Sequence, residues 1–285
     1  MPEEPEYGAK LPIDTFKLAP GGQAASAMVQ CSKLGLRAKY VGKVGGDEIG
    51  SFSLRSIESA GVDVSDVIVV QGVTNQLAMI VIDGRTGERT ILWHRPDEIA
   101  TVPSEMTPEK VCVGSVLLLD GHDAPAAARA AELAREHGVL VVLDAETVKE
   151  GTAELVANTD LLVASSRFPS LFTGEENPAL ALSLISEAGP PFVAMTLGES
   201  GAAALASDGS LVISPGFEVG VEDTTGAGDI FHGAFIYGLL QDWSVERTLT
   251  FSNAAAALNC TALGARGGIA GLEEIEALIK RDGRL

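Results

Sequence analysis

The stretch DTTGAGDIFHGAF (223–235) places two Asp, two Thr and three Gly in a short polar run that then becomes apolar. Because the apolar residues of 230–240 fall at helical spacing, we expect a helix that begins at about Gly228 or Asp229. Unpaired N–H groups and the helix dipole favour a negative charge at such an N-terminus. The N–H groups in question are those of Gly226, Ala227 and Gly228. The stretch therefore predicts a binding site for a phosphate group.

The carboxylate of Asp229 follows this turn and would repel the phosphate that the turn attracts. Two interpretations resolve the conflict. In the first, Asp229 belongs to the N-cap or first turn and stabilises the helix by about 1 kcal/mol. In the second, Asp229 is a general base that takes a proton from an attacking hydroxyl while the neighbouring N–H groups hold the phosphoryl group. The motif by itself leaves both open.

Short β-branched runs alternate with Ala/Leu-rich helical patterns along most of the chain, which is typical of βα units around a mainly parallel sheet. Strands buried on both faces are expected at 38–44, 115–120, 139–144, 160–164 and 191–197. Helices that end in Gly are expected at 125–138 and 178–189. The pattern predicts an α/β fold. Since no repeat or Pro/Ser-rich linker interrupts the chain, we expect one domain.

The segment QLAMIVIDGRTGERTILWH (76–94) breaks the βα alternation. It alternates along two runs joined by a polar turn that contains Gly, which predicts an antiparallel hairpin. Since open α/β sheets bind ligands at their strand ends, an inserted hairpin can serve there as a lid. An ordinary addition to the sheet edge fits the pattern equally well.

Composition excludes several classes of partner. The net charge of −19 repels nucleic acid and anionic lipid. No window approaches the roughly 18 consecutive apolar residues of a membrane span, and the acidic start does not resemble a signal peptide, so a cytoplasmic location is expected. The widely separated Cys31, Cys112 and Cys260 suggest neither a zinc site nor a disulfide framework.

Two stretches together resemble the PfkB/ribokinase family of carbohydrate kinases. Residues 223–235 are similar to its C-terminal signature, and GGQAASAMVQCSKLGLRAKYVGKVGGDEIGSFSLRSIESAGVDVS (21–65) is similar to its N-terminal signature. The resemblance extends over nearly the whole chain. It implies a ribokinase-like three-layer α/β/α sandwich, formed by residues 1–285 as a single domain. It also implies a β lid from about 8–20 and 72–96.

The resemblance implies that ATP, with Mg²⁺, donates a phosphoryl group to a primary hydroxyl of a small sugar. Asp229 corresponds to the catalytic base, and the backbone of 226–228 to the anion hole. The positions that match the nucleotide site are Ser165, Thr196, Gly198, Gly201 and Asn253. The positions that match the sugar site are Gly21, Gly22, Gln23, Ser26 and Asp120. Asp120, in DGHD, is also typical of an ordinary turn at a strand end.

Members of the family often bind a monovalent cation such as K⁺ beside the anion hole. The corresponding positions here are Asp223, Thr225, Asn259, Ala262, Gly264 and Gly268. A cation held there would fix the shape of the turn and add positive potential next to a phosphate. Asp223 and Thr225 are otherwise ordinary turn-forming residues.

Two departures from the family's pattern bear on the metal and the substrate. Ser165 and Phe168 stand where many members have an N-x-x-E motif. We therefore expect Mg²⁺ to be held mainly by nucleotide phosphates and water, with Asp229 or Asp144 assisting. The ketohexokinase and sulfofructose-kinase branches share this loss, which favours a ketohexose-type acceptor. Ser26 replaces an expected Asn, which leaves fewer fixed donors for sugar hydroxyls.

The third departure is the apparent absence of a strand. The family begins with a core strand, and this sequence resembles the family only from a point after that strand. Residues 1–20 resemble the tail of the first lid segment. We therefore expect that another segment fills the place of that strand or that the natural chain is longer.

The function expected from these features is ATP-dependent phosphorylation of a sugar. The alternatives are a ribokinase- or nucleoside-kinase-type activity and a non-catalytic sugar- or nucleotide-binding homologue. A homodimer formed through the lid is also expected, because a two-stranded sheet is only marginally stable alone.

Overall fold

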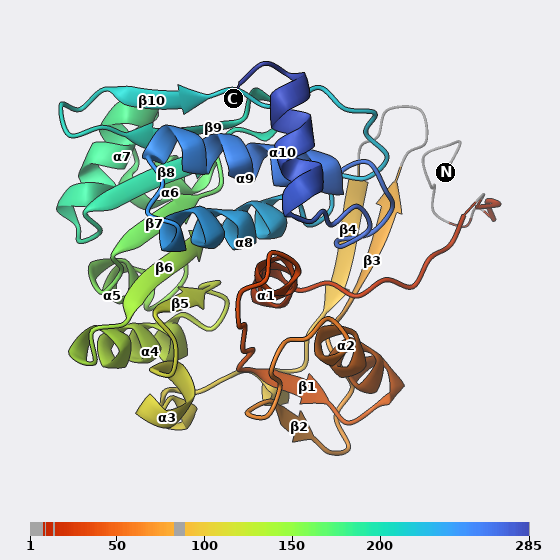
Figure 1. The fold of residues 1–285 in the computed structure, drawn as a ribbon. Helices are drawn as coiled ribbons and strands as arrows, with labels where there is room; N and C mark the ends of the chain where they lie inside the picture. The colour runs from red at the N-terminus through yellow and green to blue at the C-terminus, as the bar shows by residue number, and fades with distance from the viewer. Residues whose placement is uncertain (1–7, 9, 14, 83–88, 285) are drawn as a thin grey trace.

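The computed structural model describes residues 8, 10–13, 15–82 and 89–284. In this part of the chain six strands form the main sheet, in the order β10-β9-β8-β7-β6-β5 (Figure 1). Its parallel strands are β5 (Val116–Leu119), β6 (Leu140–Ala145), β7 (Leu161–Ala164) and β8 (Phe192–Thr196). Its antiparallel strands are β9 (Ala202–Leu205) and β10 (Leu211–Ser214). The prediction of a mainly parallel sheet is confirmed.

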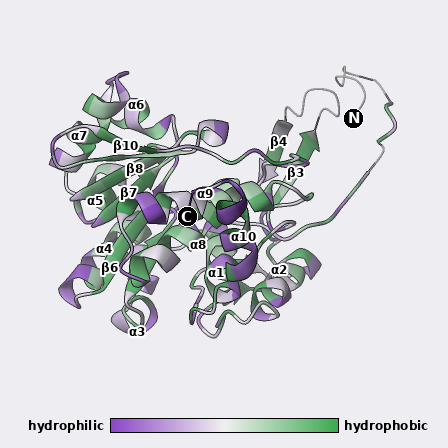
Figure 2. Ribbon diagram, turned by 45° about the horizontal axis from the view of Figure 1, so that its top comes forward, coloured by the Kyte–Doolittle hydropathy of each residue, from purple (hydrophilic) through white to green (hydrophobic). Residues whose placement is uncertain are grey.

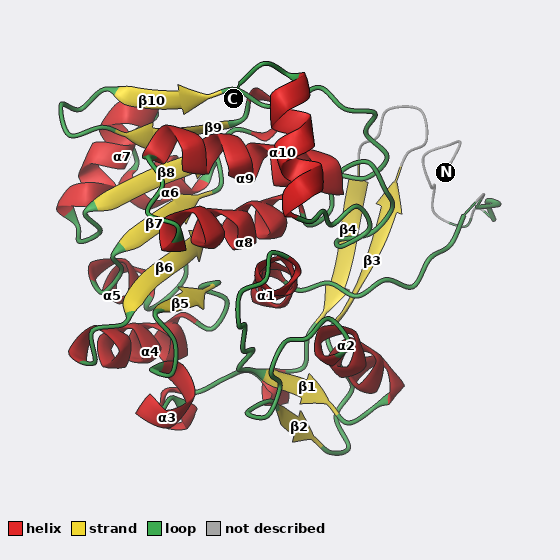
Figure 3. Cartoon of the chain, viewed as in Figure 1, coloured by secondary structure: helices red, strands yellow, loops and turns green. Residues whose placement is uncertain are grey.

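Helices cover both faces of this sheet (Figure 3). One layer contains α4 (Ala124–Glu136), α5 (Thr152–Ala157), α6 (Phe168–Thr173) and α7 (Pro178–Glu187). The other contains α1 (Gln23–Lys33), α8 (Ala227–Leu240), α9 (Val245–Asn259) and α10 (Leu272–Arg281). Shorter pieces are α3 (Pro108–Val111) and the 3-10 turns η1 (Asp97–Ile99), η2 (Pro103–Glu105) and η3 (Gly198–Ser200).

The central strands are buried on both sides, as the uninterrupted apolar runs predict. Val141 and Leu143 of β6 pack in the core under α4 to α7, whereas Val142 between them packs with residues of α1 and α8. In β7, Val163 packs against α8 and α9. Figure 2 shows this concentration of hydrophobic residues along the strands. Because successive side chains of a strand point to opposite faces, the two sets of core contacts define a three-layer α/β/α sandwich.

A smaller unit lies beside the main sheet (Figure 1). It consists of the parallel pair β1 (Lys43–Gly45) and β2 (Ile68–Val70), joined through α2 (Glu48–Glu58). The prediction of a strand at 38–44 was therefore wrong in its bounds and in its sheet. Only residues 43 and 44 belong to β1, and β1 pairs with β2 instead of joining the main sheet. Strand propensity alone does not specify the pairing partner.

Within the described residues, β5 is an outer strand of the main sheet. A cavity of about 2360 Å³ lies beside it, lined by β5, by residues 36–44 and by the strands of the lid. No described strand pairs with the free edge of β5, so none takes the place of the additional core strand that the family resemblance led us to expect.

The predicted hairpin is present as β3 (Leu77–Ile82) and β4 (Arg89–His94), which pair antiparallel with Met79 opposite Leu92. Its turn, 83–88, lies outside the described residues. The described residues of 8–20 form no helix or strand, so the lid sheet has two strands in the part of the chain that the structure covers. A search of the described helices finds none with the length and apolar character needed to cross a membrane.

Candidate active site

The turn at the start of α8 has a backbone conformation that requires glycine. The helix begins at Ala227, one or two residues earlier than predicted, and its N-cap, Gly226, has φ 77°. A Cβ at Gly226 would overlap the carbonyl oxygen of Ala265, so the turn packs directly on the loop that follows α9.

The amides of this turn are partly available for a ligand. Ala227 N–H donates to the carbonyl of Thr224 at 3.3 Å, whereas no protein acceptor is recorded in the described part of the chain for the N–H of Gly226 or Gly228. Of the three predicted donors, two therefore remain for an anion, supported by the positive end of the helix dipole.

Asp229 lies in the first turn of α8 and lines the large cavity. Burial, with a further contribution from nearby Asp144, raises the pKa of Asp229 to about 7. A carboxyl group with a pKa near neutrality can both accept and release a proton under physiological conditions, which is what a general base requires. Asp229 is thus a first-turn residue of α8 whose carboxyl group lies at the cavity.

A second polar pair lies beneath Asp229. The side chain of Asp144, at the end of β6, is buried, with its Oδ2 3.5 Å from Nδ1 of His232. The same Nδ1 lies 2.7 Å from the carbonyl oxygen of Gly228, and Nε2 lies 3.3 Å from that of Val163. His232 thus connects the first turn of α8 to β7. His232 belongs to no motif in the sequence, because it is a single His without a spaced partner.

The loop predicted to bind a monovalent cation is assembled around Asp223. Its Oδ1 accepts from Thr225 N–H at 2.9 Å and from the Thr225 hydroxyl at 2.6 Å, and its Oδ2 accepts from Gly264 N–H at 2.8 Å. The Asn259 amide donates to the carbonyls of Thr225 and Ala265 at 3.2 and 3.1 Å. The structure therefore brings Asp223, Thr225, Asn259 and Gly264 together.

The remaining two predicted positions, Ala262 and Gly268, lie in the same loop, and a Cβ at Gly268 would overlap the carbonyl oxygen of Leu258. No group of three or more His, Cys, Asp or Glu suited to a metal ion occurs among the described residues. A monovalent cation held by carbonyl and amide oxygens does not need such a group.

The predicted nucleotide residues follow the carboxyl ends of adjacent strands. Ser165 comes directly after β7, and Thr196 ends β8 with its hydroxyl donating to the carbonyl of Ala164 at 3.4 Å. Gly198 and Gly201 have φ 60° and 94°, and a Cβ at Gly201 would overlap backbone atoms at the end of β10. These positions form one edge, as parallel strands require.

Asn253 and Phe168 are used for internal packing. Asn253 is 6% exposed, and its amide donates to the backbone oxygen of Ser214 at 2.9 Å. Phe168 is 1% exposed and belongs to the core under α4 to α7. A buried phenyl ring cannot support a hydrated cation at the second position of the lost N-x-x-E motif.

On the sugar side, Gly21 and Gly22 precede α1 and line the cavity with Gln23. Gln23 Nε2 donates to Glu146 Oε2 at 3.0 Å. Asp120 also lines the cavity, while its Oδ1 accepts from His122 N–H at 3.0 Å, so it combines the strand-end turn with a position facing the ligand space.

Ser26 does not face the cavity. It is fully buried, and its hydroxyl accepts from Arg266 Nε at 3.0 Å. Ser26 therefore holds Arg266 in place and is not among the residues that line the cavity, contrary to its predicted role as a direct sugar ligand.

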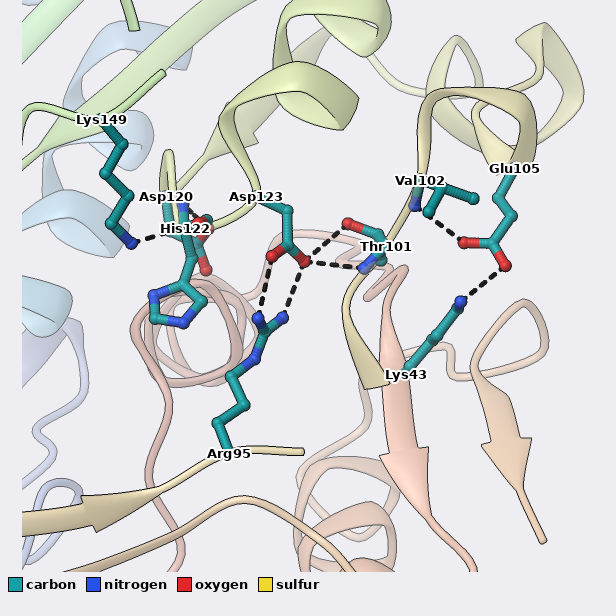
Figure 4. A network of polar contacts seen from close by, with 9 residues as sticks. All are labelled: Lys43, Arg95, Thr101, Val102, Glu105, Asp120, His122, Asp123 and Lys149. Atoms are coloured by element: carbon teal, nitrogen blue, oxygen red, sulfur yellow. Dashed lines mark hydrogen bonds and ion pairs between the residues drawn. The ribbon is translucent and has the colours of Figure 1, made fainter. Parts of the chain in front are cut away.

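Figure 4 shows how the base of the lid is fixed to the main sheet. Arg95, immediately after β4, donates to both carboxylate oxygens of Asp123 at 2.9 and 2.7 Å. Asp123 Oδ2 also accepts from the backbone and hydroxyl of Thr101. A bidentate guanidinium–carboxylate pair has a fixed geometry, so it sets where the hairpin leaves the body of the protein.

Together the structure has three α/β/α layers, a helix N-terminus with available N–H groups, the carboxyl group of Asp229 beside it, and a two-stranded hairpin along the same cavity. The family model for pfkB family carbohydrate kinases matches residues 2–270, and the chain belongs to this family of carbohydrate kinases.

Relatives and solved structures agree with this assignment. The ATP-dependent ribose-1-phosphate kinase of Halopiger xanaduensis is 31% identical, with 92% of this chain and 87% of that protein covered. The ribokinase of Haemophilus influenzae is 27% identical, with 92% and 88% covered. The crystal structure of ribokinase from Thermotoga maritima superposes with a TM-score of 0.82 at 25% identity, covering 96% of this chain and 92% of that one. The ribokinase-like fold is thereby confirmed.

Proposed function

We propose that the protein transfers the γ-phosphoryl group of ATP to a primary hydroxyl of a small sugar, with Asp229 as general base and the backbone amides of 226–228 as the anion hole. The observation that carries this proposal is the position of Asp229. Its carboxyl group lines the cavity in the first turn of α8, beside the N–H groups of Gly226 and Gly228, which have no acceptor among the described residues.

In the proposed reaction, the acceptor hydroxyl lies between Asp229 and the γ-phosphoryl group. Asp229 takes the proton as the new O–P bond forms, and the helix N-terminus stabilises the charge on the transferred group. The lid, held at its base by Arg95 and Asp123, excludes water from the cavity and so reduces hydrolysis of ATP.

Mg²⁺ would neutralise charge on the β- and γ-phosphates. The chain's own residues give it limited support. Phe168 is in the core, and the buried Asp144 faces His232. Asp229 and Glu146 are carboxylates that line the cavity and could bind water around the ion. We therefore propose that the nucleotide phosphates and water hold most of the metal.

For the acceptor, the names of the relatives favour a ribose-type sugar over the ketohexose expected from the missing N-x-x-E motif. One relative is named for ribose 1-phosphate and the other for ribose, and both are covered over most of their length. We therefore propose a five-carbon sugar or its derivative as the acceptor.

A coupled ADP-release assay tests the proposed activity. Wild-type protein is supplied with ATP, Mg²⁺ and one of ribose, 2-deoxyribose, ribose 1-phosphate, fructose or adenosine, and the product is identified by ³¹P NMR. We expect the highest kcat/KM with a ribose-type acceptor. Highest activity with adenosine would favour the nucleoside-kinase alternative, and binding without turnover of any acceptor would favour a non-catalytic homologue.

The pH dependence of the reaction should report the carboxyl base. The pKa of Asp229 is raised to about 7 by burial and by Asp144, and the base acts in its deprotonated form. The kcat/KM for the acceptor should therefore fall about tenfold per pH unit below pH 7 and be constant above about pH 8. Steady-state kinetics in buffers of constant ionic strength measure this. A flat profile across this range would contradict the assignment.

We also propose that K⁺ binds the loop formed by Asp223, Thr225, Asn259 and Gly264. Asn259 Oδ1 is buried and has no hydrogen-bond partner among the described residues, as expected for an oxygen that faces a cation. Replacing K⁺ by choline at constant ionic strength should lower kcat severalfold, and titration with KCl should restore it. Equal rates in both salts would exclude the proposed role.

The lid supports the further proposal of a homodimer. Leu92 and Trp93 of β4 are 59% and 62% exposed and do not line the cavity. Exposed apolar groups on a small sheet are typical of an interface. The chain mass is 29.5 kDa, and light scattering should give twice this mass for the wild type. Trp93→Glu should give the mass of a single chain. The control Leu180→Glu, which changes an exposed apolar residue of α7, should remain a dimer. A monomeric wild type would refute the dimer.

A further inference from the structure

Two loops at the carboxyl ends of β8 and β10 lie in direct backbone contact. The nucleotide loop, 198–201, follows β8 and contains two of the glycines predicted to bind the nucleotide, and the β10 exit loop is 214–217. A Cβ at Gly201 would overlap the carbonyl oxygen of Ser214, and a Cβ at Gly216 would overlap a carbonyl oxygen of the nucleotide loop. Because these contacts leave no room for a side chain, a shift of one loop displaces the other.

Arg284 follows α10, whose end lies beside the end of β10 (Figure 1), and it holds the β10 exit loop. Its guanidinium donates from Nη1 to the carbonyl of Pro215 at 2.6 Å and from Nη2 to the carbonyl of Gly216 at 2.7 Å. Its Cζ lies 4.1 Å from the centre of the Phe217 ring, and its Nε pairs with a carboxylate oxygen of Asp282. One planar guanidinium thus contacts three consecutive residues of the loop.

The two ends of the β10 exit loop have other anchors. At its start, Asn253 Nδ2 donates to the carbonyl of Ser214 at 2.9 Å. At its end, the Phe217 ring belongs to the core formed with α8, α9 and α10. For the carbonyl of Gly216 between them, the hydrogen bond from Arg284 is the one recorded within the described part of the chain. The residue that touches the nucleotide loop therefore depends on the arginine for its polar anchor.

The effect of this anchor should be confined to the nucleotide side of the site. Neither Arg284 nor the β10 exit loop is among the residues that line the large cavity, which contains Asp229 and the positions expected to bind the sugar. The side chains of Arg284 and Asp282 are 26% and 37% exposed, and ion pairs with such exposure contribute little to global stability. We therefore expect that the fold is retained when the arginine is replaced.

We propose that Arg284 is a positioning residue for the nucleotide, and that it sets the affinity for ATP by holding the β10 exit loop against the nucleotide loop. This inference rests on the proposed phosphorylation by ATP and on the nucleotide site predicted at 198–201. It adds to that site a residue that lies 69 and 68 positions along the chain from the two carbonyls that it binds. Arg284 acts through the backbone of the two loops and does not itself contact the nucleotide.

Arg284→Ala tests the inference through the separate kinetic parameters. Steady-state kinetics with ribose as acceptor should show the KM for ATP raised about 10-fold, while kcat and the KM for ribose stay within about twofold of the wild type. An arginine with a merely structural role would change the melting temperature, or all three parameters together. Arg284→Lys keeps the charge, but one ammonium cannot reproduce the two parallel hydrogen bonds, so the KM for ATP should rise about threefold.

Two further variants complete the comparison. Arg281→Ala removes an exposed arginine of α10 that has no recorded partner among the described residues, and it should have wild-type kinetics. Gly216→Ala displaces the β10 exit loop without changing the arginine, because its Cβ overlaps the nucleotide loop, and it should raise the KM for ATP at least as much as Arg284→Ala. If Arg284→Ala fails to fold, an unchanged KM for ATP in both Arg284→Lys and Gly216→Ala would overturn the inference.

Direct binding separates this inference from the proposed function. Calorimetric titration with a non-hydrolysable ATP analogue and Mg²⁺, without an acceptor, should give a Kd that Arg284→Ala raises about 10-fold and Arg281→Ala leaves unchanged. A wild type that binds the analogue but phosphorylates no acceptor would overturn the proposed function and leave this inference intact. Equal Kd values for the wild type and Arg284→Ala would overturn the role of Arg284 and leave the proposed function intact. Absence of binding by the wild type would overturn both.

Discussion

Asp229→Asn is expected to lower kcat about 10²- to 10⁴-fold while ATP binding and the fold are retained. The amide has the size of the carboxyl group but cannot accept the proton of the sugar hydroxyl. Replacing the carboxyl also removes the repulsion between Asp229 and the buried Asp144, which contributes to the raised pKa of Asp229. The melting temperature should therefore be unchanged or higher. Single-turnover kinetics with excess enzyme and nucleotide titration measure the two effects separately.

Asp242→Asn is the matched control for this substitution. Asp242 follows the C-terminal end of the same helix and has φ 53°, a conformation that Asn adopts readily. It should have wild-type kinetics and a similar melting temperature. A kcat for Asp229→Asn within tenfold of the wild type would remove the general-base assignment and return Asp229 to the role of a first-turn helix residue.

The parts of the fold that local pattern determines were predictable from sequence. Uninterrupted apolar runs identified β5 to β8, and the polar turn before an apolar helix placed the start of α8 within two residues. The run at 38–44 looked equally strand-like, yet it contributes only to the small β1–β2 pair. Its apolar character reflects burial beside the large cavity, and burial does not specify which strand is the neighbour.

Within the site, motifs identified residues that act through backbone geometry or through a single position, such as Asp229 and Gly226. They did not indicate where Arg266 lies, because its partners Ser26 and Ser56 lie 240 and 210 residues away and no local spacing records such contacts. The same distance explains why Ser26 was predicted to contact the sugar. Its side chain was assigned from the position in a motif, whereas its direction depends on the arginine that reaches it from the other end of the chain.

Gly226→Ala should be the most damaging substitution outside Asp229, although it adds a single methyl group. The φ of 77° costs an alanine about 1–2 kcal/mol. In addition, its Cβ would overlap the carbonyl oxygen of Ala265, and backbone on both sides must shift to relieve the contact. Because the displaced segments carry the anion-binding amides and lie beside Arg266 and the proposed K⁺ loop, we expect kcat to fall about 100-fold, as a misplacement of about 1 Å does.

Gly138→Ala separates the two causes of this effect. Gly138 has φ 72° in the turn after α4, but a Cβ there meets no atom within 4 Å. It should therefore show the stability loss of the backbone conformation without any change in kcat. Denaturant unfolding and steady-state kinetics on both variants give the comparison. If Gly226→Ala and Gly138→Ala had equal activity and equal stability, the result would contradict the prediction. The close contact between the α8 turn and the loop after α9 would then have no role in ordering the anion-binding amides.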